Sequence, residues 1–111
     1  MPRPYTPYIP QDINELRDLL GSMLLGAPTF TDDSGYFPER SIHTEFQVLE
    51  GGLLRVREAI GEERYTRLTK MAGRTKSYFE EAVGDEADEV WAGRNLLLEM
   101  EDVLNEVRRS R

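Results

Sequence analysis

The sequence predicts an all-α fold, an up-down helical bundle of about four helices with a long loop between the first and second helices and an extended proline-rich N-terminal arm. In four stretches, apolar residues recur at intervals of three and four, which is the spacing of one buried helix face. No stretch has the pattern of a strand. The chain of 111 residues, 39% of them apolar, suits one domain with its own core. We therefore expect an arm at residues 1–10 and a single helical domain at residues 11–111.

The first ten residues, MPRPYTPYIP, predict an extended arm. From residue 4 every third position is proline, the repeat of a polyproline II helix, so one edge carries proline and another carries Tyr5 and Tyr8. One interpretation is a ligand for an aromatic groove, but no basic residue flanks the prolines at the spacing that proline-binding modules usually need. We expect instead an arm that packs on its own bundle or stays mobile.

The first helix is predicted to begin at residue 13 and to end at about Leu25. Asp12 and Glu15 have the spacing of a capping box. Gly26 and a proline two residues later then end the helix, because glycine commonly follows the last turn and proline cannot continue it. The apolar face consists of Ile13, Leu16, Leu20, Met23 and Leu24.

Residues 26–40 predict a long structured loop, since they lack a helical period and contain two prolines, two glycines and an Asp-Asp-Ser-Gly turn. The loop also carries the aromatic residues Phe30, Tyr36 and Phe37. This is more apolar surface than a solvated connection needs, so we expect these side chains either to plug the end of the bundle or to contact a partner.

The second helix is predicted to begin after Ser41 as N-cap and to end at Gly61. Its apolar face keeps one helical phase across Gly51 and Gly52, although each interior glycine costs about 1 kcal/mol relative to alanine. We therefore expect a continuous helix that another backbone approaches closely. The apolar face consists of Ile42, Phe46, Leu49, Leu53, Val56 and Ile60.

Two further helices are predicted in the second half of the chain. The third begins near Glu62 and Glu63, acids that suit the positive end of a helix dipole, and Gly84 ends it. The fourth occupies roughly residues 86–108 and has apolar residues seven positions apart. The third helix buries Tyr65, Leu68, Met71, Ala72, Tyr78, Phe79 and Ala82, and the fourth buries Val90, Leu97, Met100, Leu104 and Val107.

The fourth helix carries more apolar surface than one neighbour can cover. Leu96, Leu97 and Leu98 are consecutive, and with Trp91 and Val103 they spread over more than one face. Two interpretations stay open. Either the helix is central and contacts the other three, or part of it is an interface with a second copy or another protein.

The residue inventory favours no catalytic, cofactor-binding or metal-binding residues. The absence of cysteine excludes disulfides, thiolate chemistry and sulfur-ligated metals. A di-iron bundle needs two Glu-x-x-His pairs, and the chain has only one histidine, His43, so this kind of metal site is excluded. We expect His43 instead to be a half-buried residue at the start of its helix, with a hydrogen bond. The carboxylate pairs of the fourth helix are separated by about 20 Å along that one helix, which does not suit a magnesium site built between two helices. A calcium-binding loop that began at Asp32 would need a glutamate at its twelfth position, and this position is not a glutamate here.

Charge is strongly segregated along the chain. The net charge of −7 disfavours nucleic acid and anionic membranes as ligands and favours a basic protein partner. Seven bases and three acids lie between Arg55 and Lys76, whereas ten acids and one base lie between Glu80 and Glu106. We expect a basic ridge on the third helix and an acidic ridge on the fourth to lie side by side as exposed ion pairs, each worth about 0 to 1 kcal/mol. The ridges are Arg67, Lys70 and Arg74, and Glu99, Asp102 and Glu106.

A concentrated negative patch is predicted around the turn between the third and fourth helices, where no base interrupts the acids. Such a patch would accelerate encounter with a basic protein and would weaken with salt. The candidate partner-binding residues are Glu80, Glu81, Asp85, Glu86, Asp88, Glu89, Tyr36, Phe37 and Trp91.

The leading functional hypothesis is a non-enzymatic protein–protein interaction module, such as an immunity protein, an antitoxin or an adaptor, by analogy of size, charge and helicity. The first alternative is a self-associating, homodimeric bundle of structural role. The second is a small metal-dependent hydrolase or ligand-binding protein, whose pocket would be formed by Tyr36, Phe37, His43, Tyr65 and Trp91. The chain has no apolar leader and no run of about 18 apolar residues, so we expect a cytoplasmic protein.

Overall fold

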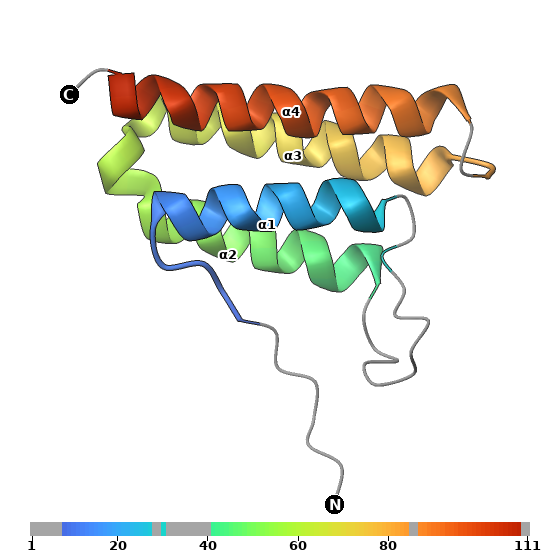
Figure 1. Ribbon diagram of the computed structural model, residues 1–111, viewed down its shortest axis with the longest axis horizontal. Helices are drawn as coiled ribbons and strands as arrows, with labels where there is room; N and C mark the ends of the chain where they lie inside the picture. The colour runs from blue at the N-terminus through green and yellow to red at the C-terminus, as the bar shows by residue number, and fades with distance from the viewer. Residues whose placement is uncertain (1–7, 28–29, 31–40, 85–86, 110–111) are drawn as a thin grey trace, which may run out of the picture.

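The computed structural model describes residues 8–27, 30, 41–84 and 87–109, and within them the chain forms four helices and no strand (Figure 1). The helices are α1 (Ile13–Gly26), α2 (Ile42–Ile60), α3 (Glu62–Glu81) and α4 (Asp88–Arg109). The predicted all-α class is therefore confirmed, and the predicted helix limits differ from the observed ones by only a few residues. The first seven residues of the predicted arm, and most of the predicted loop, lie outside the described residues.

The helices pack in a ring around a shared core. Contacts join α1 to α2, α2 to α3, α3 to α4 and α4 back to α1, and Figure 1 shows α3 and α4 side by side above α1 and α2. The main neighbours of α4 are thus α3 and α1. Its Leu96, Leu97 and Val103 are buried, whereas Trp91 and Leu98 are 62% and 47% exposed. The bundle therefore covers only part of the apolar surplus that the sequence places on this helix.

Side-chain caps determine where α1 and α2 begin. The Asp12 carboxylate accepts a hydrogen bond from the Glu15 N–H at 2.8 Å. The Glu15 carboxylate reaches further back than in a capping box, because it accepts from the Gln11 N–H at 2.8 Å and from the Tyr8 hydroxyl at 2.8 Å. A complete capping box starts α2 at Ser41. Since these caps use residues close in sequence, both helix starts were predictable.

Gly51 and Gly52 lie inside an uninterrupted α2, and neighbouring side chains pack directly on them. A Cβ atom on Gly52 would lie 2.9 Å from Leu16 Cδ1 and 3.2 Å from Pro10 Cγ. A Cβ atom on Gly51 would lie 3.2 Å from Ile9 Cγ2. The predicted continuous helix is therefore confirmed, but the expected close approach of another backbone is wrong: the groups that pack on the two glycines are side chains of α1 and of the segment that precedes it.

Three phenylalanine rings fill one end of the core. Phe30, Phe46 and Phe79 are each at most 2% exposed, and their ring centroids lie 5.6 to 6.3 Å apart. Phe30 has a φ of 60°, a backbone conformation that bulky residues rarely adopt, so ring packing has to hold this loop residue in place. Phe30 thus plugs the end of the bundle, which is one of the two outcomes expected for the aromatic residues of the loop. Tyr36 and Phe37 lie outside the described residues.

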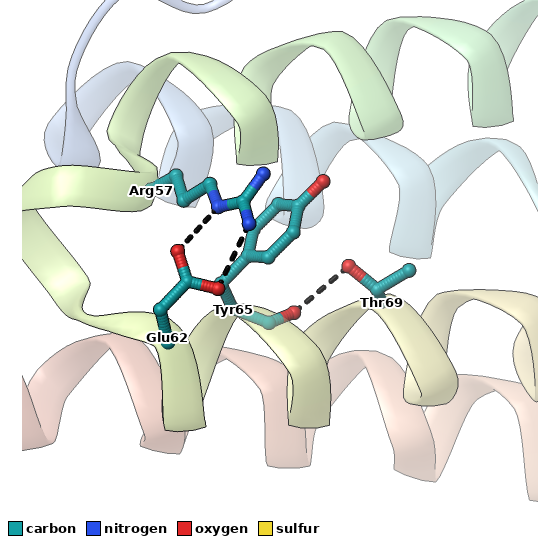
Figure 2. A network of polar contacts seen from close by, with 4 residues as sticks. All are labelled: Arg57, Glu62, Tyr65 and Thr69. Atoms are coloured by element: carbon teal, nitrogen blue, oxygen red, sulfur yellow. Dashed lines mark hydrogen bonds and ion pairs between the residues drawn. The ribbon is translucent and has the colours of Figure 1, made fainter.

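The corner between α2 and α3 is held by charged and aromatic side chains (Figure 2). Gly61 at this corner has a φ of 89°, which glycine adopts without steric cost. Arg57 donates from Nε and Nη2 to the two carboxylate oxygens of Glu62, and its guanidinium lies 4.5 Å from the Tyr65 ring centroid. The Thr69 hydroxyl donates to the Tyr65 carbonyl at 2.8 Å. Hydrogen bonds from Arg57 lower the pKa of Glu62.

The contribution of Glu62 to stability should therefore depend on pH. Because folding lowers the pKa of this carboxyl below its ordinary value of 4.5, its contribution is present above that value and is lost as the pH falls through the folded pKa. We expect Glu62→Gln to lower the urea midpoint slightly at neutral pH, with the difference from the unsubstituted chain closing as the pH falls below 4.5. Urea titrations of both chains across this range check it. A difference that stays constant with pH would contradict the assigned ion pair.

Candidate partner-binding site

The end of α3 and the start of α4 meet at one end of the bundle (Figure 1) and together carry four carboxylates and two exposed apolar side chains. Val83 is 92% exposed and Trp91 is 62% exposed. Three of the carboxylates belong to exposed residues and the fourth is half-buried. We call this surface the acidic end, and its described residues are Glu80, Glu81, Val83, Asp88, Glu89 and Trp91.

A short reversal of the chain brings these two helix ends together. The last residue of α3 is Glu81, and Ala82 after it has an extended backbone. Gly84 has a φ of 103°, so a side chain at this position would strain the turn. The Ala87 N–H donates to the Gly84 carbonyl at 3.4 Å, just before α4 begins. Val83 therefore lies in the turn outside both helices, where no described element covers it.

The acids of this surface do not all stabilise the helices that carry them. Asp88 and Glu89 lie in the first turn of α4, where a helix dipole favours negative charge. Glu80 and Glu81 lie in the last turn of α3, which contains no basic residue. Exposed acids at this negative end of a helix cost about 0.3 to 1 kcal/mol each. The sequence thus keeps negative charge here at some cost in stability, which is common at surfaces with a function.

The charges of the acidic end are not neutralised by neighbours within the described part of the chain. No ion pair joins its four carboxylates to another described residue. The sequence has no lysine or arginine between residues 80 and 91. Ion pairs elsewhere in the bundle join Arg57 to Glu62 and two arginines of α3 to Glu106. The acidic end therefore presents a negative field that attracts cationic groups.

The predicted partner-binding residues fall into two groups. The structure brings together Glu80, Glu81, Asp88, Glu89 and Trp91 at the acidic end. The others lie outside the described residues, and these are Tyr36, Phe37, Asp85 and Glu86. Sequence reasoning missed Val83. The signal that could have found it is an apolar residue that follows two acids closely and immediately precedes a turn glycine.

The pocket considered for a hydrolase or ligand-binding protein does not form from its described members. His43 starts α2, whereas Tyr65 packs on Arg57 near the other end of that helix, about 20 Å away at 1.5 Å per residue. The expectation that His43 is half-buried is wrong: its side chain is exposed because Phe46 occupies the buried face, and its ring lies 3.0 Å from the Gln47 amide nitrogen. Among the described residues, no three His, Asp or Glu side chains are grouped so that they could hold a metal ion.

The fold and the site together define an all-α protein whose described residues form four helices with an exposed, negatively charged end. Within the described ranges, no helix combines the length and the apolar character that crossing a membrane requires. Comparison with protein-family models, with curated proteins and with solved structures finds no match.

The fluorescence of Trp91, the only tryptophan of the chain, should report the negative field of the acidic end. Caesium ions are expected to quench it more efficiently than iodide ions, relative to free tryptophan amide, because the surrounding acids attract cations and repel anions. The ratio of the two quenching constants should exceed that of the free amide by about twofold at low salt and return to it at about 0.5 M NaCl.

A pair of variants controls this measurement. Asp88→Asn with Glu89→Gln should bring the ratio of quenching constants close to that of the free amide, whereas Glu58→Gln, an exposed acid of α2, should leave it unchanged. A ratio of quenching constants for Trp91 that equals that of the free amide at low salt would show that the acids do not act on this side chain.

Proposed function

We propose that this chain is a non-enzymatic binding protein whose acidic end docks a basic protein partner, in the manner of an immunity protein, an antitoxin or an adaptor. One observation carries the proposal: Val83 and Trp91 are exposed at the same end of the bundle as four carboxylates that form no ion pair with another described residue. Tryptophan is among the residue types that contribute most to the energy of protein interfaces. Exposed apolar side chains within a polar rim are typical of such interfaces.

The two kinds of residue at the acidic end suit different parts of binding. The exposed side chains of Val83 and Trp91 can be desolvated by a partner, which favours a long-lived complex. The carboxylate rim raises the rate of encounter with a positively charged surface and disfavours acidic partners. The net charge of −7 repels nucleic acid and anionic lipid, so the favoured partner class is a basic protein.

The proposal includes the finer features of the predicted architecture and location. We propose a single helical domain at residues 11–111, arranged as an up-down bundle with the predicted loop and arm, in the cytoplasm. Two contacts support the alternating helix directions. Phe46 near the start of α2 contacts Phe79 near the end of α3, and Arg67 in the first half of α3 pairs with Glu106 near the end of α4.

Photo-crosslinking in the native host tests the proposed function. A photoreactive amino acid at Val83 of the full chain is expected to capture a basic protein, and capture should fall several-fold at about 0.5 M salt. The same amino acid at Gly73 is the position control and should not capture this protein. Gly73 is an exposed position on α3 where an added Cβ atom would meet nothing within 4 Å. Capture of the same proteins from both positions would contradict the proposal.

Charge-neutral variants separate binding from folding. Glu80→Gln with Glu81→Gln is expected to reduce capture from position 83 several-fold while the urea midpoint stays equal or rises, because two acids leave the negative end of α3. Glu58→Gln with Glu63→Gln removes as much charge from exposed sites elsewhere and should leave capture unchanged. Undiminished capture by the first variant would show that the acids of α3 do not hold a partner.

A further inference from the structure

A groove of about 540 Å³ lies between α3 and α4, on a different surface from the acidic end. Its floor is apolar and consists of Met71, Leu96 and Val103, of which the last two are buried. Its walls are charged, with Arg67 and Arg74 on α3 and with Glu99, Asp102 and Glu106 on α4. The basic and acidic ridges therefore lie side by side, as expected, but of the expected ion pairs between them only that of Arg67 with Glu106 forms among the described residues. All ridge residues except Lys70 line the groove.

Two contacts fix how α3 and α4 are aligned. Near one end, the Arg67 guanidinium lies 3.5 Å from the Glu106 carboxylate. Near the other, a Cβ atom on Gly93 would lie only 2.5 Å from the Phe79 ring. The two helices therefore run antiparallel in a single register over the whole length of the groove.

In this register, the remaining charged residues of the two ridges lie at matching positions along the helix axis. Counting along the helices from the two contacts, Arg74 lies level with Glu99, and Lys70 lies level with Asp102. All four are exposed. No ion pair joins any of them to another described residue, so opposite charges stand at matching positions along α3 and α4 without pairing with each other.

We infer that this face binds the same face of a second copy of the chain. Rotation of one copy about a two-fold axis parallel to the helices keeps the position of every residue along the helix axis. It places α3 of each copy over α4 of the other. Arg74 of one copy then faces Glu99 of the second copy, Lys70 faces Asp102, and the symmetric pairs form as well. A two-fold axis across the helices would instead stack α3 on α3 and oppose like charges. The charge pattern therefore selects the first arrangement.

The dimer is weak and sensitive to salt. Each exposed ion pair contributes little, the apolar floor is small, and two copies with a net charge of −7 repel each other at long range. Specificity for a second copy comes from the pattern of both signs on one face, which a uniformly acidic or basic partner does not match.

Charge reversal tests the dimer with its own internal control. Lys70→Glu with Arg74→Glu leaves Arg67 as the only base of the basic ridge, and Glu99→Lys with Asp102→Lys leaves Glu106 as the only acid of the acidic ridge. Each variant alone should self-associate at least about tenfold more weakly than the unsubstituted chain in sedimentation equilibrium at low salt. An equimolar mixture of the two should form a heterodimer, because each wall of one variant then faces an opposite charge on the other.

A chain with all four substitutions decides between a lost interface and a damaged fold. It carries every change but again has walls of opposite sign, so it should self-associate as the unsubstituted chain does, and circular dichroism should show helical structure in all variants. An unsubstituted chain that is monomeric at high micromolar concentration and low salt overturns the proposal. Reversed variants that associate unchanged, or a mixture that does not associate, overturn it equally.

Discussion

Replacement of Phe46 by alanine is expected to lower the free energy of unfolding by about 3 to 5 kcal/mol, a large part of the stability of a domain of this size. Phe46 is 1% exposed, and its ring centroid lies 6.0 Å from that of Phe30 and 6.3 Å from that of Phe79. The substitution removes buried apolar surface, leaves a cavity and deletes two ring contacts. It also frees Phe30, whose positive φ depends on this packing.

Urea unfolding followed by circular dichroism measures this loss. Phe46→Leu keeps most of the buried volume and should cost less than half as much as Phe46→Ala. An alanine variant within about 1 kcal/mol of the unsubstituted chain would show that the three rings do not form the end of the core.

Gly93→Ala and Gly73→Ala make the same chemical change and should shift stability in opposite directions. At Gly93 the new Cβ atom would lie 2.5 Å from Phe79 Cε1 and 2.9 Å from Cδ1 and Cζ, in a ring that is only 2% exposed. We expect Gly93→Ala to destabilise the chain by about 1 to 3 kcal/mol despite the better helix propensity of alanine. At Gly73 nothing lies within 4 Å, so Gly73→Ala should stabilise it by about 0.5 to 1 kcal/mol.

A double-mutant cycle assigns the effect at Gly93 to its neighbour. Phe79→Leu gives the alanine room, so it should cost less in the Gly93→Ala background than in the unsubstituted chain. The free energies from urea unfolding of the four chains give the coupling directly. A Gly93→Ala chain more stable than its parent would mean that α3 and α4 do not pack in the register described.

The helix limits could be predicted because the signals that set them are close in sequence. Asp12 and Ser41 cap the helices that follow them, and Gly61 separates α2 from α3 at a positive φ. The preserved apolar phase also predicted that Gly51 and Gly52 lie in one continuous helix. Each of these conclusions needs only a few neighbouring residues and the periodicity of a helix.

Contacts between distant segments could not be predicted in this way. An isolated glycine in the fourth helix does not indicate that Phe79 occupies the space of its missing side chain. The position of His43 beside an apolar stripe suggested partial burial, but which side of a helix is covered depends on where the loop and the neighbouring helices lie. For the same reason, the sequence could not show whether the residues proposed as a pocket converge, and the described ones do not form this pocket.

The candidate site was predictable in its charges and less so in its shape. The run of acids without a base is visible in the sequence, and Trp91 was singled out because the fourth helix has surplus apolar surface. Val83 was missed because the third helix was expected to continue to Gly84, whereas α3 ends at Glu81. Only the structure shows that the turn exposes this valine beside the acids.

Hydroxyl-radical footprinting of the full chain, in buffer and in extract of the native host, tests most directly whether the acidic end is the binding surface. Oxidation of Trp91 and Val83 should fall several-fold in extract and recover at about 0.5 M salt. Oxidation of Leu54, which is 58% exposed on α2, should not change and serves as the internal reference. Full reactivity of Trp91 in extract, with protection found at Leu54 instead, would contradict the account.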